Sequence, residues 1–287
     1  DQTPELPTLR IQYKDYASWY VKSLKEGEFA DQRAYWQQQF ASGIPVLEFP
    51  LKSTRPSIKT YNGKTLKTHL GKQVTADIHS YRKQHEASLY MYMLSTLYIM
   101  LNRYTGADDI VIGSPYAARE HIDLKNQIGF YTNTLAIRNQ LKKGDTFNSF
   151  FTSVQQSVLA AYNHQQYPFD KLIEDLKLKK DLSRNPIFDV MLVVVSNNST
   201  TETTETLAEE ITLEKNTTSK FDLLFFIEEV GNQLSLKVEY NTDLYDEDFI
   251  KQFMMYYKKM LTLLLETPQR ELSSIDYVAE KAILNTE

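Results

Sequence analysis

Five histidines are the side chains of this sequence that exchange protons near neutral pH, and the chain contains no cysteine. No two histidines stand at the His-x-x-x-His spacing that would place both on one helix face around a metal ion. The sequence also lacks a Gly-x-Ser-x-Gly turn and a phosphate-binding glycine loop. Without cysteine, disulfides, thiol nucleophiles and cysteine-bound zinc are excluded. The spacing therefore predicts no metal site and no self-sufficient catalytic unit.

Asn133 is the most unusual polar residue, because it interrupts an apolar row. Residues 127–138 alternate in the manner of a strand, and Gly129 permits a tight turn or a close backbone approach. A buried Asn is costly unless its amide is hydrogen-bonded. Asn133 therefore either bonds to a neighbouring loop or lies in the wall of a cleft.

Arg119 and His164 are the next candidates. Arg119 follows a predicted strand and a loop that contains Pro115. It is either solvated or reaches a carboxylate across a cleft. His164 ends a predicted helix beside an aromatic turn that includes Tyr167. The last carbonyls of a helix favour a donor side chain, so a capping role is the plain alternative for His164.

A polar turn at 181–186 holds three further candidates, Ser183, Arg184 and Asn185. Asp181 could pair with Arg184 across this turn while Asn185 caps backbone groups. Turn formation alone would explain all of these residues.

Helical and alternating patterns are mixed along the chain without a regular βαβ repeat, which predicts an α+β fold with a mixed sheet. Thr75, Ser88 and Asp246 are expected N-caps, and Gly231-Asn232 indicates a hairpin. The first two helices have no obvious partner of their own, so later residues or a portion outside this chain must cover them. Helices are expected at 8–26, 29–42, 75–85, 89–104, 146–164, 169–178 and 246–265, and strands at 64–71, 109–114, 127–138, 187–196, 209–216, 221–230 and 233–241.

Composition narrows the class of protein. The net charge is −5, and basic and acidic residues are mixed, so no nucleic acid partner is expected. The longest apolar runs are strand-sized, which predicts no membrane segment. The lack of cysteine and of a visible signal peptide fits a cytoplasmic location. The chain opens at Asp1 in a polar segment that contains proline, as the middle of a longer protein would.

Several motifs, taken in order, resemble those of condensation domains of nonribosomal peptide synthetases. Each motif is weak alone, but four or more at plausible spacing are specific, and they cover nearly the whole chain. The matching stretches are Tyr13–Trp19 (Tyr-Lys-Asp-Tyr-Ala-Ser-Trp), Ile128–Leu135 (Ile-Gly-Phe-Tyr-Thr-Asn-Thr-Leu), His164–Asp170 (His-Gln-Gln-Tyr-Pro-Phe-Asp), Asp181–Pro186 (Asp-Leu-Ser-Arg-Asn-Pro), Phe221–Leu223 and Glu239–Tyr245.

The resemblance implies two chloramphenicol-acetyltransferase-like lobes with a tunnel between them. Upstream and downstream peptidyl carrier proteins would present substrates on phosphopantetheine arms, and no cofactor would be bound directly. An amine would attack a thioester and form an amide. The family's His-His-x-x-x-Asp-Gly motif carries the key histidine, and no His-His pair occurs here. That motif is expected upstream of residue 1, so no catalytic residue is expected within this chain.

The resemblance also implies a domain division. Residues 1–50 would be the helical end of the N-terminal lobe, 51–63 a linker, 64–266 the C-terminal lobe, and 267–287 a linker toward a following adenylation domain. The 197–220 region is the expected latch between lobes. Arg119 would hold the aspartate of the missing motif by a bidentate pair. Substrate-channel or structural roles are expected for Asn133, Arg119, Ser183, Arg184, Asn185, His164 and Tyr167.

Two alternative functions stay open. One is a non-catalytic module that docks carrier or adenylation domains, and the other is that of an epimerisation-type relative. The Asn133 and Ser183–Pro186 patterns favour a condensation domain over the epimerisation relative.

Overall fold

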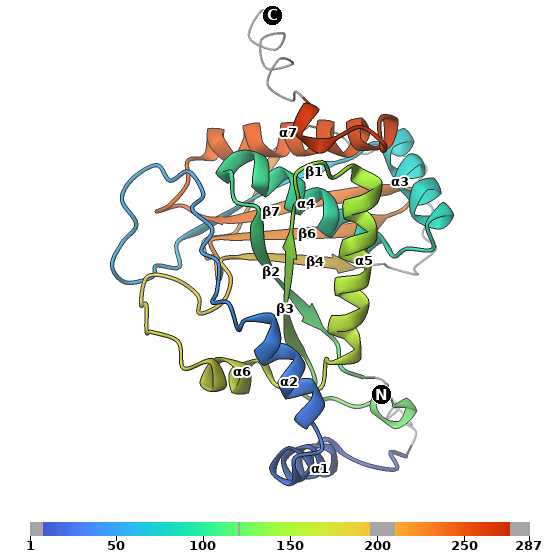
Figure 1. Cartoon of the computed structure of the whole chain (residues 1–287), viewed down its shortest axis with the longest axis vertical. Coiled ribbons are helices and arrows are strands. Elements are labelled where there is room, and N and C mark those ends of the chain that lie inside the picture. Colours follow the sequence, from blue (N-terminus) through green and yellow to red (C-terminus); the bar gives the residue numbers. More distant parts are fainter. Residues whose placement is uncertain (1–7, 120, 196–209, 276–287) are drawn as a thin grey trace, which may run out of the picture. The chain divides into compact units, whose positions relative to one another are not determined.

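A computed structural model describes residues 8–119, 121–195 and 210–275 (Figure 1). The chain divides into two compact units. The first unit holds residues 1–43, 115–135 and 161–178, and the second unit holds residues 44–114, 136–160 and 179–287. The boundaries fall inside β2 (Asp109–Tyr116), β3 (Asn133–Gln140) and α5 (Phe147–Asn163).

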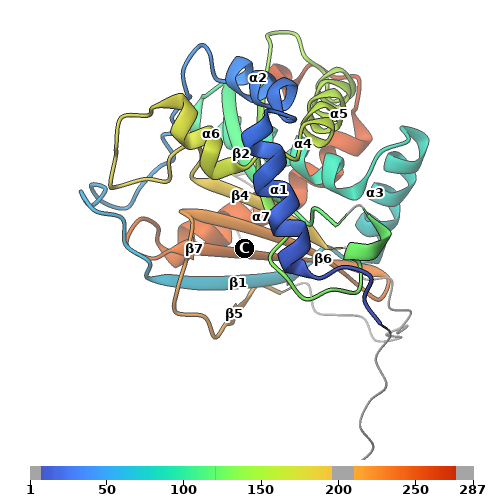
Figure 2. The same cartoon turned by 90° about the horizontal axis from the view of Figure 1, so that it is seen from below.

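A seven-stranded sheet, in the order β3-β2-β4-β6-β7-β1-β5, confirms the predicted mixed sheet (Figures 1 and 2). β4 pairs in parallel with β2 and with β6, whereas β7 pairs antiparallel with β6 and β1. β5 closes the edge antiparallel to β1. The strands are β1 (Gly63–His69), β4 (Val190–Val195), β5 (Thr212–Glu214), β6 (Leu223–Val230) and β7 (Gln233–Asn241), with β2 and β3 as given above.

Helices α3 (Lys72–Gln84), α4 (Leu89–Thr105) and α7 (Glu247–Glu266) pack on the sheet, because α3 and α7 contact β7 and α4 contacts β4. Every residue of α4 from Leu89 to Leu101 is buried, as its nearly all-apolar circumference predicts. The apolar side of α5 is buried as well. None of the helices in the described ranges is long and apolar enough to cross a membrane.

Local capping signals gave mixed results. Ser88 caps α4 by accepting a hydrogen bond from the amide of Met91, as expected. The prediction for Thr75 was wrong, because α3 begins at Lys72 and its N-cap is Gly71. The Thr75 hydroxyl instead donates to the carbonyl of Gly71 and accepts from the amide of Leu234. Since this hydroxyl finds both partners inside the core, Thr75 is accommodated within the helix.

The hairpin prediction is confirmed, since Val230 pairs with Gln233 and Gly231 has a φ of 59°. The strand expected at 209–216 is shorter, and only Thr212–Glu214 pairs with β1. The rest of the region expected to form a latch lies partly outside the described residues, and its role stays a prediction.

In the first unit, α1 (Tyr13–Glu26) and α2 (Ala30–Gln39) receive their partners from later parts of the chain. α2 contacts α6 (Phe169–Leu176), and Arg33 forms a bidentate ion pair with Asp175 at 2.6 and 2.7 Å. The hydroxyl of Tyr20, in α1, donates to the carbonyl of Gln166. The amphipathic helices are therefore covered by residues 161–178 and 115–135 of this same chain.

Residues 51–63, expected as a linker, are extended but anchored in the second unit. The amide of Lys52 donates to the carbonyl of Leu244 and the amide of Lys59 to that of Leu182. The division into two lobes at this segment stays a prediction.

Candidate functional site

Asn133 begins β3 and uses its side-chain amide fully. Its Nδ2 donates to the carbonyls of Gln165 and Tyr167, both at 2.8 Å. Its Oδ1 accepts from the amides of Thr134 at 2.8 Å and Phe169 at 3.1 Å. Asn133 therefore holds the turn that leads from α5 to α6, and it joins two of the sequence motifs into one structural piece. Both interpretations of the sequence are present, because the Asn133 amide bonds to a neighbouring loop and Asn133 also lines a cavity described below.

The strand expected over 127–138 begins only at Asn133. Although the predicted alternation persists, with Tyr131 buried and Phe130 exposed, residues 127–132 form an irregular loop, so the predicted strand was wrong for this half of the stretch. The reason is that the backbone carbonyls of Gln127 and Gly129 accept hydrogen bonds from the Arg119 guanidinium rather than from a neighbouring strand.

Arg119 organises this loop. Its Nη1 donates to the carbonyls of Leu124 and Gln127, and its Nη2 donates to that of Gly129 at 3.1 Å. The guanidinium carbon also lies 4.4 Å from the centre of the Tyr131 ring, a cation–π distance. Arg119 is thus neither free in solvent nor paired with a carboxylate in these contacts. Its expected pair with an aspartate outside this chain stays a prediction.

His164 and Tyr167 lie in the turn that Asn133 holds. The His164 ring stacks on Tyr35, with the ring centres 4.0 Å apart and the planes at 8°. The His164 carbonyl accepts a hydrogen bond from the indole Nε1 of Trp36 at 2.7 Å. The Tyr167 hydroxyl donates to Asp175, and burial, followed by this carboxylate, raises the pKa of Tyr167 to about 12. Both residues pack the turn against α2 and α6.

The carboxylate of Asp175 links α2 to this turn, so the free energy of unfolding should depend on pH. Burial acts to raise the pKa of Asp175, but hydrogen bonds from Arg33 and Tyr167 outweigh it and hold the pKa below its ordinary value. The stabilisation is therefore present above the unfolded pKa of about 3.9 and is lost as pH falls through the lower folded pKa. Urea midpoints between pH 7 and pH 2 should show Asp175→Asn less stable than wild type at neutral pH, with the gap closing in acid. A constant gap would contradict this account.

A cavity of about 840 Å³ opens in the first unit beside these residues. Its wall is mainly aromatic and apolar, with Tyr16, Trp19, Tyr20 and Tyr131 among the lining residues. Asn133 and Gln165 also line it. The cavity can therefore bind an apolar group. Among the residues that the structure describes, no cluster of three or more histidines, cysteines or carboxylates is suited to a metal ion.

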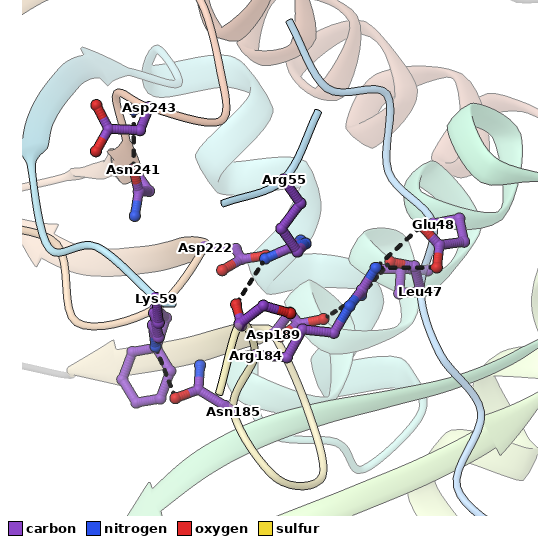
Figure 3. Close-up of polar contacts among 12 residues, drawn as sticks. Leu47, Glu48, Arg55, Lys59, Arg184, Asn185, Asp189, Asp222, Asn241 and Asp243 are labelled. Carbon is purple, nitrogen blue, oxygen red and sulfur yellow. Dashed lines mark hydrogen bonds and ion pairs between the residues drawn. The ribbon is translucent and has the colours of Figure 1, made fainter. Parts of the chain in front are cut away.

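The 181–186 turn lies in the second unit and carries a separate network (Figure 3). Arg184 pairs with Asp189 and Glu48 rather than with Asp181, the partner that the sequence allowed. Its Nη1 donates to Asp189 at 2.7 Å, and its Nη2 contacts both carboxylate oxygens of Glu48 at 2.9 and 3.0 Å. Asp181 instead accepts from the amide and hydroxyl of Ser183. Ser183 closes the turn by bonding Asp181, so the Arg184 side chain can reach Glu48 in the segment 44–62.

Two buried carboxylates lie at the centre of this network. Arg55 is paired with Asp222, whose side chain is 1% exposed, and it also donates to the carbonyl of Ser183. Burial raises the pKa of Asp189, and the nearby Asp222 adds to the shift, against the opposing effect of Arg184 and Arg55. The arginines offset the repulsion between the carboxylates, so this is a structural ion network.

Asn185 bonds a side chain rather than the backbone groups expected. Its Oδ1 accepts from Lys59 Nζ at 2.7 Å, and the same ammonium donates to the carbonyl of Lys220. Burial lowers the pKa of Lys59. Together, Lys59 and Arg55 fasten the segment 44–62 to the turn and to the start of β6.

The structure therefore groups Asn133, Arg119, His164 and Tyr167 in the first unit, and Ser183, Arg184 and Asn185 in the second. The sequence reasoning missed Arg55 and Asp222. A signal existed for Asp222, because a carboxylate directly before the apolar run 223–227 enters the core with a strand and needs a partner. Nothing in the local sequence identified Arg55 as that partner.

Solved structures define the class of fold. The X-domain from teicoplanin biosynthesis superposes with a TM-score of 0.83 at 26% identity, over 96% of this chain and 64% of that chain. A four-domain nonribosomal peptide synthetase bound to AMP and glycine gives a TM-score of 0.77 at 22% identity, over 86% of this chain and 20% of that one. The architecture is the chloramphenicol-acetyltransferase-like α+β fold of condensation domains, as expected.

Sequence comparison then gives the family. The Condensation domain family matches residues 1–283, and the chain belongs to this family of nonribosomal peptide synthetase domains. Tyrocidine synthase 3 of Brevibacillus parabrevis is 38% identical over 275 residues, and Gramicidin S synthase 2 of Brevibacillus brevis is 36% identical over 277 residues. These alignments cover 94% and 96% of this chain but only 4% and 6% of those relatives' length.

Proposed function

We propose that this chain is part of a condensation domain that forms an amide between two carrier-bound substrates. The match of the family over residues 1–283 carries the proposal, because condensation domains generally form amide bonds. The acceptor amine attacks the thioester carbonyl of the donor, a C–N bond forms, the C–S bond breaks, and the proton of the amine leaves with the thiol. The donor acyl or peptidyl group and the acceptor aminoacyl group would both be carried on phosphopantetheine arms.

This chain's residues would shape the site rather than perform the proton transfer. Asn133 and Arg119 fix the turn and loop beside the aromatic cavity through the contacts described above. Abstracting a proton from an amine requires a base, and we propose that the histidine of a His-His-x-x-x-Asp-Gly motif outside this chain provides it. The isolated chain is then expected to form no amide.

The proposed partners follow from the same function. They are upstream and downstream peptidyl carrier proteins, an adjacent adenylation domain and the remainder of the condensation domain. The four-domain synthetase structure supports this setting, because its domain of this fold occurs in a multidomain chain. A cytoplasmic location belongs to the same proposal.

A docking role without catalysis is the second candidate. One specific observation favours it: the teicoplanin X-domain, with a TM-score of 0.83 to this chain, was solved in complex with OxyB. A domain of this fold thus presents a binding surface to another protein. An epimerisation-type relative is the third candidate.

Reconstitution separates these functions. The full polypeptide that contains this sequence is incubated with two loaded carrier proteins, and the products are identified by mass spectrometry. Amide product, absent when the chain of residues 1–287 replaces the full polypeptide, is the expected result. Binding of carriers with no product would support the docking module, and loss of Cα tritium from a carrier-bound aminoacyl group would support epimerisation.

A further inference from the structure

The ion pair between Arg55 and Asp222 in the second unit uses only part of its hydrogen-bonding capacity. Arg55 Nη2 donates to Asp222 Oδ2. The Nε of Arg55 and the Oδ1 of Asp222 are buried, and none of the described residues offers either atom a hydrogen bond. A buried polar atom without a partner costs free energy, so both atoms require an explanation.

Two other arginine–aspartate pairs of the chain show what a complete pair looks like. In the pairs Arg33–Asp175 and Arg138–Asp109, the arginine donates from both Nε and Nη2 to the two carboxylate oxygens. A guanidinium fork and a carboxylate match each other in this bidentate form. The Arg55 pair is different, because only Nη2 of its fork reaches the carboxylate. One donor and one acceptor of this pair are therefore left for a third group.

Asp189 and Asn185 supply two more buried atoms that have no partner within the described ranges, Oδ1 of Asp189 and Nδ2 of Asn185. The other oxygen of Asp189 accepts from Arg184 Nη1 at 2.7 Å, and Oδ1 of Asn185 accepts from Lys59 Nζ at 2.7 Å. Because an ammonium can only donate, Lys59 determines which atom of the Asn185 amide is the oxygen. The remaining atom of this amide is therefore an N–H donor.

The four atoms belong to one network (Figure 3). Asp189 and Asp222 directly precede β4 and β6, which pair in parallel, and the amide of Asp222 donates to the carbonyl of Asp189 at 3.1 Å. Arg55 donates to the carbonyl of Ser183, two residues before Asn185. Burial and then the charge of Asp222 raise the pKa of Asp189, as expected for two carboxylates that lie close together.

We propose that these four atoms bind one buried water molecule. Two of the atoms accept hydrogen bonds, Oδ1 of Asp189 and Oδ1 of Asp222, and the other two donate, Arg55 Nε and Asn185 Nδ2. Water donates two hydrogen bonds and accepts two, and a buried water typically makes about three. A cation would meet two N–H donors at this site, and an anion would meet two carboxylates. The site therefore requires a neutral ligand that both donates and accepts, and water is the smallest one.

A proton shared between the carboxylates is the alternative. If Asp189 were protonated, it could donate directly to Oδ1 of Asp222. That arrangement would leave Arg55 Nε and Asn185 Nδ2 without a partner, whereas a water molecule serves all four atoms. The water would also join the segment 44–62, the turn at 181–186 and the starts of β4 and β6. This inference goes beyond the proposed function and does not depend on it.

Crystallography that resolves ordered water tests the proposal on the chain of residues 1–287. We expect a single density peak at about 2.7–3.2 Å from at least three of the four atoms. The lack of such a peak would overturn the proposal. A direct contact between Oδ1 of Asp189 and Oδ1 of Asp222 at hydrogen-bond distance would also overturn it, in favour of the shared proton.

Oxygen-17 magnetic relaxation dispersion counts long-lived internal waters in solution and gives a second test. Asn185→Leu keeps the approximate shape of the side chain but removes the donor, so the dispersion amplitude should fall by the contribution of one water. Asp181→Asn is the matched control, because this residue is exposed in the same turn and its Oδ1 can still accept from Ser183. An unchanged amplitude in folded Asn185→Leu would overturn the proposal, and the crystallographic density decides if this variant does not fold.

Discussion

Replacing Arg55 by methionine is expected to lower the free energy of unfolding by about 3–5 kcal/mol, the largest effect that we predict for a single substitution. Asp222 would lose its ion-pair partner in a site where its side chain is 1% exposed, with Asp189 nearby. Removing one member of a buried ion pair leaves an uncompensated charge, which costs more than the intact pair contributes.

Chemical denaturation at pH 7 measures this effect, with Arg10→Met as the control. Arg10 forms a 3.5 Å pair with Asp123, but its own side chain is 79% exposed, so its loss should cost under about 1 kcal/mol. The double variant Arg55→Met, Asp222→Asn should recover part of the lost stability, because the orphaned charge is gone. Equal stability of Arg55→Met and Arg10→Met would show that the network does not stabilise the second unit.

Replacing Asn133 by alanine is expected to cost about 2–3 kcal/mol, because four backbone groups lose their partner in a half-buried position. Asn133→Asp should not rescue the loss, since a carboxylate oxygen would then face the carbonyls of Gln165 and Tyr167. The effect should be concentrated in the turn between α5 and α6.

Hydrogen exchange read peptide by peptide gives the test. The amide of Phe169 should exchange faster in Asn133→Ala, because Asn133 Oδ1 is its acceptor. Asn126→Ala, at an exposed position of the same unit, is the control and should leave exchange in this turn unchanged. Unaltered protection at Phe169 in the Asn133 variant would contradict the role that we assign to this side chain.

Elements with strong local signals could be predicted from the sequence. α4 and α5 have apolar patterns that only burial explains, and the Gly231-Asn232 turn has the residue chemistry of a hairpin. The candidate site was harder to predict. Asn133 stood out because an amide in an apolar row needs partners, but those partners lie more than 30 residues away. No local rule names them.

Three expectations failed because the side chain or backbone group found another partner in the folded chain. Thr75 is a good N-cap by type, but its hydroxyl is satisfied inside the core by Gly71 and Leu234. Residues 127–132 alternate like a strand, but the Arg119 guanidinium donates hydrogen bonds to the carbonyls of Gln127 and Gly129, and these residues form a loop. Arg184 could have paired with Asp181, three residues away, but Asp189 and Glu48 bind it instead.

By itself, the sequence determined the α+β class, most helices and strands and, through its ordered motifs, the condensation-domain family. These properties depend on periodicity and residue type along short stretches. Both can be recognised in the sequence before the structure is known. Only the tertiary structure decided which charges pair, which turn Asn133 holds and which apolar side chains stay exposed on the 121–132 loop. Those outcomes depend on burial and on partners far apart in the chain, and both exist only once the chain is folded.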